Sequence, residues 1–158
     1  MSGSVSPYIR DSIVDSAVAI VLVQTGNRRN AITISCFSEV AHYPAAIWIS
    51  VAKTAYSHDL IREAKRFSVA VLSEKQRTVA LTCGTTSGRS VDKCRSLDLY
   101  QSPGGFLFLR GALASTGTLL SKAIEIGDHT MFLGNIVEAH LDSHASRLRH
   151  LLLSDLRD

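Results

Sequence analysis

The chain has 158 residues, of which 46% are hydrophobic and 20% charged, a composition typical of a folded globular domain rather than a disordered chain. The formal net charge is only +3, and the sequence has neither a run of basic residues nor an apolar stretch of about 20 residues, which argues against nucleic-acid and membrane partners. The first residues lack the basic and apolar regions of a secretion signal, so we expect one domain over residues 1–158 in the cytoplasm.

Seven segments have the composition of β-strands. They are rich in β-branched and aromatic residues, and several alternate apolar with polar side chains, as half-buried strands do. These segments are residues 17–25, 30–40, 46–52, 67–72, 105–113, 114–126 and 129–140. Short strands without regular strand–helix–strand alternation favour a closed barrel over a doubly wound sheet. We therefore expect a mainly β fold.

Three further segments predict helices. The first runs to residue 64, and Ser57 or Asp59 could cap its N-terminus. Residues 74–83 mix apolar and helix-tolerant polar residues, and a loop rich in Gly, Ser and Thr follows them. The leucines of the C-terminal tail have helical spacing. We expect a helix over residues 143–157 that packs on the barrel or on a partner subunit.

Six motifs resemble, in their order and spacing, those of the flavin reductase-like family of FMN-binding split barrels. The resemblance spans residues 17–140, and the last motif is the most specific. The motifs are NAITISCFS at 30–38, YP at 43–44, KTAYSH at 53–58, RFSVAVL at 66–72, SGRSVDK at 87–93 and GDHTMFLG at 127–134. The resemblance implies a six-stranded split β-barrel with Greek-key character and short helices, paired as a homodimer. It also implies FMN as the cofactor, with FAD as an alternative, and NADH or NADPH as the co-substrate.

The same resemblance implies which residues hold the flavin. Hydroxyls on the first motif would serve the ring and the ribityl chain. Donors in the third and fifth motifs would hold the phosphate, which convergent donors and cations bind best. A cation in the fifth motif could also offset negative charge on the reduced ring. His129 would lie near the flavin and the nicotinamide, and it is the candidate catalytic residue. The candidate cofactor-binding residues are Asn30, Thr33, Ile34, Ser35, Cys36, Ser50, Ala52, Lys53, Ser57, His58, Ser87, Gly88, Arg89 and Lys93.

Several of these residues also have an ordinary structural interpretation. Thr33 and Ser35 could form the solvated face of a strand, and Lys53 and Arg89 could be surface charges. His129 could be a histidine of a turn. The three cysteines lack the spacing of a zinc site, so we expect reduced thiols and no bound metal.

Two functions of different classes follow from the sequence. The first is an NAD(P)H-dependent flavin oxidoreductase, which could supply reduced flavin to a partner monooxygenase or to another electron acceptor. The alternative is an FMN-binding electron carrier or partner subunit without NAD(P)H activity. A GxGxxG fingerprint is absent, but split barrels do not use one, so its absence does not separate the two. A structural protein without a cofactor is a third interpretation.

Overall fold

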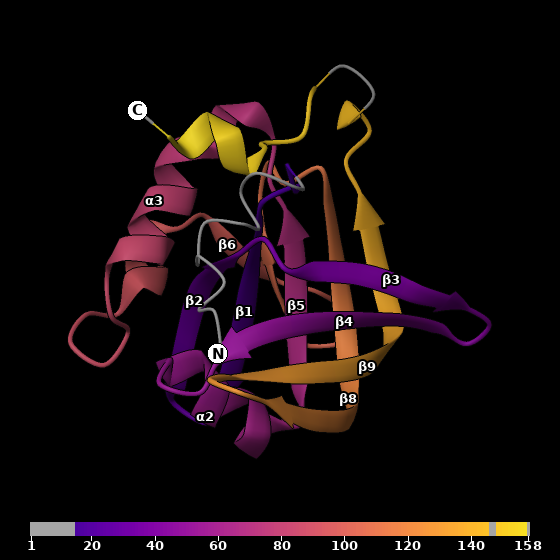
Figure 1. Cartoon of the computed structure of the whole chain (residues 1–158). Helices are drawn as coiled ribbons and strands as arrows, with labels where there is room; N and C mark the ends of the chain where they lie inside the picture. The colour runs from indigo at the N-terminus through magenta and orange to yellow at the C-terminus, as the bar shows by residue number, and fades with distance from the viewer. Residues whose placement is uncertain (1–14, 146–147, 158) are drawn as a thin grey trace, which may run out of the picture.

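A curved seven-stranded antiparallel sheet forms the body of the molecule (Figure 1). The computed structural model describes residues 15–145 and 148–157. The strands of this sheet lie in the order β2-β1-β5-β8-β9-β4-β3. Their bounds are β1 (Ala19–Thr25), β2 (Arg28–Ile34), β3 (Phe37–His42), β4 (Ala45–Ala52), β5 (Arg66–Val71), β8 (Ala114–Ile126) and β9 (His129–Leu141).

Smaller elements surround this sheet. In Figure 1, α3 covers one side of the barrel and α2 lies at one end. None of the helices within residues 15–145 and 148–157 is long and apolar enough to cross a membrane. The smaller elements are α2 (Tyr56–Ala64), α3 (Arg77–Thr85), the 3-10 helices η1 (Glu74–Gln76), η2 (Lys93–Ser96) and η4 (Leu153–Leu156), and a second sheet of β6 (Leu99–Gln101) and β7 (Leu107–Leu109).

The sheet opens between β2 and β3, which follow each other in the chain but lie at opposite edges of the sheet. The expected single strand over residues 30–40 is therefore wrong. The chain bends at Ser35 and Cys36, and its two halves pair with different neighbours, β2 with β1 and β3 with β4. The N–H of Ser50 donates a 3.0 Å hydrogen bond to the carbonyl of Cys36, which holds the bend against β4. This division also gives the sheet seven strands instead of the expected six.

Strand β1 is buried on both faces and separates two hydrophobic clusters. Ile20 and Leu22 belong to a cluster that includes residues of α3 and β7. Val21 belongs to the cluster inside the barrel, where it shares the core with Phe67 and Phe132. Full burial of one such side chain contributes about 1.5 to 3 kcal/mol, so the β-branched run of β1 anchors both layers.

The two α-helices lie close to where the sequence predicts them, but α2 begins differently. Its N-cap is Ala55, and no side chain caps it, so Ser57 and Asp59 lie inside the first turn. The expectation that one of these two residues caps the helix is wrong. Helix α2 ends at Lys65, whose φ of 57° is left-handed and turns the chain into β5.

The strand expected over residues 105–113 is reduced to β7, and β6 was not expected. Gly105 and Gly111 have φ values of 76° and 75° and turn the chain on either side of β7. These turns limit β7 to three residues that pair with β6, within the loop region that follows α3. The paired strands β6 and β7 pack against the hydrophobic cluster that contains Ile20 and Leu22.

The C-terminal tail does not form the expected helix over residues 143–157. Instead, His150 and Leu152 form isolated β-bridges with Ser73 and Ala17, and within residues 148–157 the helical element is the short η4. The N–H of Leu151 donates to the carbonyl of Leu72 at 2.9 Å, and the Leu151 carbonyl accepts from Val18 at 2.8 Å. These bonds use the backbone groups that a helix would need. The side chain of Leu151 is buried in the same cluster as Ile20 and Leu22.

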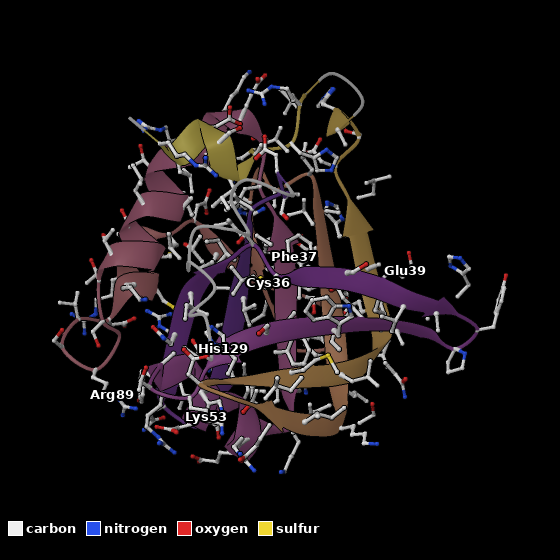
Figure 2. The ribbon with its side chains drawn as sticks, viewed as in Figure 1. Cys36, Phe37, Glu39, Lys53, Arg89 and His129 are labelled. Carbon is white, nitrogen blue, oxygen red and sulfur yellow. The ribbon has the colours of Figure 1, made fainter. Side chains whose placement is uncertain are left out.

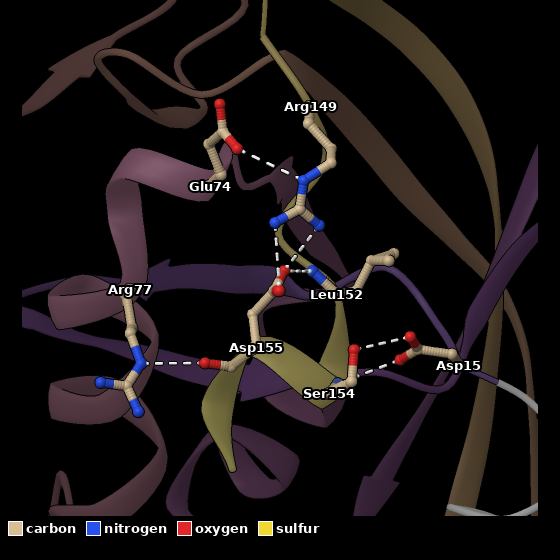
Figure 3. A network of polar contacts seen from close by, with 7 residues as sticks. All are labelled: Asp15, Glu74, Arg77, Arg149, Leu152, Ser154 and Asp155. Carbon is tan, nitrogen blue, oxygen red and sulfur yellow. Dashed lines mark hydrogen bonds and ion pairs between the residues drawn. The ribbon is translucent and has the colours of Figure 1, made fainter. Parts of the chain in front are cut away.

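A polar network fastens this tail (Figure 3). Arg149 donates two parallel hydrogen bonds to Asp155, at 3.0 and 3.1 Å, and a third to Glu74 at 3.3 Å. Asp155 also accepts from the N–H of Leu152 at 2.8 Å. Ser154 donates to Asp15 through its N–H and its hydroxyl, at 3.0 and 2.6 Å. The network joins both ends of the described chain to η1.

Candidate functional site

The first candidate cavity, here called the split cavity, lies at the opening of the sheet, between the end of β2 with the bend that follows it and the end of β4. Its volume is about 180 Å³. The bend at Ser35 and Cys36 forms one wall, and the pairing of β4 with β9 brings His129 opposite Ala52 at the other. The lining residues are Ile32, Thr33, Ile34, Ser35, Cys36, Ser50, Val51, Ala52 and His129.

A second cavity, here called the loop cavity, adjoins the first at Ile32 and has a volume of about 220 Å³. The start of α2, the end of α3 and the loop that follows α3 enclose it. Because no side chain caps α2, the first N–H groups of this helix provide a partial positive charge at the cavity. The lining residues are Asn30, Ile32, Thr54, Ala55, Tyr56, Cys83, Gly84, Thr85, Thr86, Ser87, Gly88 and Lys93.

Lys93 is a buried cation in the wall of the loop cavity. Only 4% of this residue is exposed. Its ammonium donates a 3.0 Å hydrogen bond to the carbonyl of Cys83 in the last turn of α3, where the helix carries a partial negative charge. Burial lowers the pKa of Lys93. An ammonium has three donors, so Lys93 can bind the end of α3 and an anion together.

Asn30, Ser57 and Gly88 hold the loop after α3 close to α2. The Asn30 Nδ2 atom donates a 2.9 Å hydrogen bond to the Ser57 hydroxyl. The Asn30 Oδ1 atom is buried and accepts no hydrogen bond from any described residue. A Cβ atom on Gly88 would lie 2.1 Å from that oxygen, so only glycine fits here without movement of the loop. The structure therefore leaves one unsatisfied buried acceptor beside the loop cavity.

Three candidate residues have packing contacts that the sequence did not indicate. Ser57 and His58 are buried and line neither cavity. His58 Nε2 shares a 2.8 Å hydrogen bond with the Thr130 hydroxyl, which fastens α2 to β9. Thr33 lines the split cavity, but its hydroxyl donates to the carbonyl of Ala80 at 2.6 Å and so joins β2 to α3.

The two cations expected at the phosphate form ion pairs away from the split and loop cavities. Lys53 binds Glu125 at 3.2 Å, and hydrogen bonds from Arg62 and Lys53 lower the pKa of that carboxyl. Arg89 binds Asp59 at 2.8 Å. In Figure 2, Arg89 lies to one side of the barrel, at the loop that follows α3. Both side chains are partly exposed, as expected for the alternative interpretation that Lys53 and Arg89 are surface charges. Lys93, in contrast, is buried.

His129 is the candidate catalytic residue, and it lines the split cavity with 44% of its side chain exposed. Its Nδ1 atom lies 2.8 Å from Asp128 Oδ1, and this hydrogen bond lowers the pKa of the Asp128 carboxyl. A carboxylate at one ring nitrogen fixes the orientation of an imidazole. His129 is thus an imidazole held by a carboxylate in the wall of the split cavity.

The candidate cofactor-binding residues omit eight residues that line the loop cavity, namely Ile32, Thr54, Ala55, Tyr56, Cys83, Gly84, Thr85 and Thr86. Ala55 and Tyr56 lie at the start of α2, within the KTAYSH motif, so the motif itself was the signal that could have found them. Gly84, Thr85 and Thr86 lie at the end of α3. Nothing in their local sequence reveals that α3 packs against β2.

Comparison with models of known protein families assigns the chain to one of them. The family model described as "Flavin reductase like domain" matches residues 12–155, nearly the whole chain. The chain belongs to the flavin reductase-like family. The family assignment confirms the resemblance that the six motifs indicated.

Individual relatives are distant. The chain is 27% identical over 131 residues to the "NADH-dependent FMN reductase AsuE2" of Streptomyces nodosus subsp. asukaensis, covering 81% of this chain and 70% of that protein. It is also 27% identical over 125 residues to the "High molecular weight rubredoxin" of Moorella thermoacetica, covering 76% of this chain. The match spans about half, 53%, of that longer protein.

A solved structure in this family has the same fold. The Streptomyces globisporus NADH:FAD oxidoreductase SgcE6 superimposes with a TM-score of 0.83 at 25% identity, covering 99% of this chain and 96% of that one. The mainly β fold, with its barrel and two α-helices, is therefore the fold of flavin reductases.

Proposed function

We propose that this flavin reductase-like protein binds FMN across the split and loop cavities and transfers hydride from NADH or NADPH to the flavin. The observation that carries the proposal is the junction of the two cavities at Ile32. One cavity presents hydroxyls beside apolar side chains, and the other presents a helix N-terminus and a buried ammonium. Relatives named as NADH-dependent flavin reductases support the same chemistry.

The residues of the two cavities suit the two ends of FMN. In the split cavity, Ile32 offers apolar contact to a flat ring, and Ser35 and Ser50 offer hydroxyls. In the loop cavity, the first N–H groups of α2 and the ammonium of Lys93 suit a phosphate, because helix N-termini and cations both favour anions. FMN fits a site that is apolar at one end and electropositive at the other.

Bound flavin would supply the hydride-accepting chemistry, as cofactors generally do. The chain would bind and orient the reactants. His129, held by Asp128, lies where it can position the nicotinamide against the split cavity. Lys93 would hold the phosphate and offset the negative end of α3. No side chain has to act as a nucleophile.

We also propose a homodimer, because the split cavity continues into an exposed apolar face. The register of β4 and β9 places Trp48 opposite Leu133 and Ala52 opposite His129, with all four on one face. Further along β9, at the irregularity in its pairing with β8, Val137 is 54% exposed. A second copy seated on this face would cover these side chains and the mouth of the cavity. Light scattering should report a dimer that Val137→Glu weakens, and a wild-type monomer at all working concentrations would contradict it.

The relative named as a rubredoxin favours a second candidate, a flavin-binding electron carrier without NAD(P)H activity. Anaerobic mixing separates the two functions. We expect NADH or NADPH to bleach the absorption of the FMN-loaded protein near 450 nm within seconds. An unbleached spectrum, with reduction only by dithionite, would favour the carrier. In either case, the reduced flavin could pass to a partner monooxygenase or another acceptor.

A further inference from the structure

A third cavity, here called the arginine cavity, borders the loop cavity and has a volume of about 240 Å³. The two cavities share Tyr56 and Gly88 in their walls. The residues that give the arginine cavity its character are Arg28, Arg29, Tyr56, Arg89 and Asp92. A molecule that leaves the loop cavity past Gly88 therefore enters a space lined by three guanidinium groups and one aromatic ring.

The three arginines retain hydrogen-bond donors. Arg28 binds Glu63 through one nitrogen, Nη2, and Arg89 binds Asp59 through its Nη2. Arg29 binds Asp92 through Nε and Nη2, at 3.3 and 3.2 Å. A guanidinium has five N–H donors, so each arginine has donors left for a second oxygen ligand. Because all three ion pairs are partly exposed, each contributes little to the stability of the fold. The arginines can therefore rearrange around a phosphate.

Tyr56 provides a flat surface in the same cavity. The guanidinium of Arg89 lies over its ring, 5.2 Å from the ring centre. Tyr56 belongs to the first turn of α2, the same turn that we assign to the flavin phosphate. An aromatic ring and a guanidinium plane are the groups on which nucleobases stack.

We infer that the arginine cavity binds the adenylate half of FAD, and that FAD is the preferred flavin of this protein. The inference rests on the proposed function, because it takes the flavin phosphate to lie in the loop cavity. In FAD, a second phosphate and an adenosine follow that phosphate directly, and the next space along the surface is the arginine cavity. A nicotinamide nucleotide also carries an adenylate. The nicotinamide ring of that nucleotide is assigned to the split cavity beside His129, however. The loop cavity, which the flavin phosphate occupies in this proposal, separates the split cavity from the arginine cavity.

The test compares the dissociation constants of FAD and FMN, measured by flavin fluorescence, for the wild type and the variants Arg28→Ala and Arg29→Ala. The matched control is Arg62→Ala, an exposed arginine of α2 that binds Glu125 and lines none of the three cavities. We expect the wild type to bind FAD about ten-fold more tightly than FMN, as for a charge-assisted contact. Each cavity variant should lose most of that preference and keep its FMN affinity, and the control should change neither.

Three results would overturn the inference. The wild type could bind the two flavins equally, or the variants could weaken FMN as much as FAD. The variants could also raise the KM of NADH or NADPH without changing FAD binding, which would assign the cavity to the nicotinamide nucleotide. In each case FMN still binds, so the proposed function survives. Failure of both flavins to bind the wild type would instead refute the proposed function.

Discussion

The side-chain amide of Asn30 lies against the Cα atom of Gly88 while it donates a hydrogen bond to Ser57. This contact joins β2, the start of α2 and the loop after α3 at one point. Because Asn30 is held by Ser57 and buried, the loop must move if Gly88 gains a side chain. The contact therefore holds two residues of the loop-cavity wall, Asn30 and Gly88, against each other.

Gly88→Ala should therefore weaken FMN and reduce the free energy of unfolding by about 1 to 3 kcal/mol, the usual cost of overpacking. A Cβ atom would meet the Asn30 Oδ1 atom at 2.1 Å and displace the loop. Isothermal titration and urea unfolding measure the two effects. In an Asn30→Ala background the same substitution should cost little, because its clash is gone. Equal costs in both backgrounds would show that the contact does not position the loop.

Lys93→Met should weaken FMN at least ten-fold more than it weakens riboflavin, which lacks the phosphate, since a charge-assisted hydrogen bond contributes about 1.5 to 3 kcal/mol. Lys53→Met is the matched control and should weaken neither, because Lys53 lies outside the cavities. Fluorescence titration of both flavins checks this. The FMN-to-riboflavin ratio separates a phosphate contact from a general loss of folding. The reverse pattern, with Lys53 decisive and Lys93 silent, would restore the assignment made from the sequence.

The contribution of Lys93 should also depend on pH. Only the ammonium form attracts a phosphate, and burial places the pKa of Lys93 below the ordinary lysine value of 10.5. The preference for FMN over riboflavin should thus be complete near neutral pH, where the phosphate carries its full charge, and decline as the pH rises through that lowered pKa. The same titration of Lys93→Met should lack this alkaline decline. An identical decline in both proteins would assign it to another group.

His129→Gln should slow the reduction of bound flavin by NADH about 10 to 100-fold, because a misplaced reactant costs that much. Flavin affinity should change little. Asp128→Asn keeps the ring but removes the carboxylate at Nδ1, so it should give a smaller loss. Stopped-flow absorption measures the rate at saturating NADH. If His129→Gln reduces flavin at the wild-type rate, the histidine belongs to the turn and not to the reaction.

Asp155→Ala should lower the melting temperature, because it removes the partner of Arg149 and of the Leu152 N–H. A hydrogen bond from Arg149 lowers the pKa of Asp155 in the folded protein. The stabilisation is therefore present above the unfolded pKa, near 3.8, and is lost as the pH falls through the lowered folded value. Asp98→Ala, which removes an exposed pair with Arg110, should have little effect. A difference between wild type and Asp155→Ala that persists at acid pH would contradict this account.

Most strands could be predicted from local pattern, because a run such as β1 carries its signal in adjacent β-branched residues. Long-range pairing could not. The bend at Ser35 and Cys36 becomes visible only when β2 and β3 take different neighbours. The leucines of the tail have helical spacing, yet Leu151 forms strand-type bonds to Val18 and Leu72, so tertiary contacts override the local preference.

The candidate site shows the same division. The motifs indicated which segments meet, and the structure brings Ser35, Ser50, Ala52 and His129 to one cavity and Asn30, Gly88 and Lys93 to the next. The motifs did not reveal that His58 forms a hydrogen bond with Thr130, or that Lys53 and Arg89 form ion pairs with carboxylates. Residue type alone cannot distinguish a donor that faces a cavity from one that is already paired.

Equilibrium titration of the purified protein with FMN, followed by flavin fluorescence, tests the central claim most directly. The account predicts a saturable change at micromolar FMN. Ser50→Trp, which places a large ring in the wall of the split cavity, should abolish that change while the fold is retained. The absence of any change in wild-type signal up to millimolar protein would contradict the claim that these cavities hold a flavin.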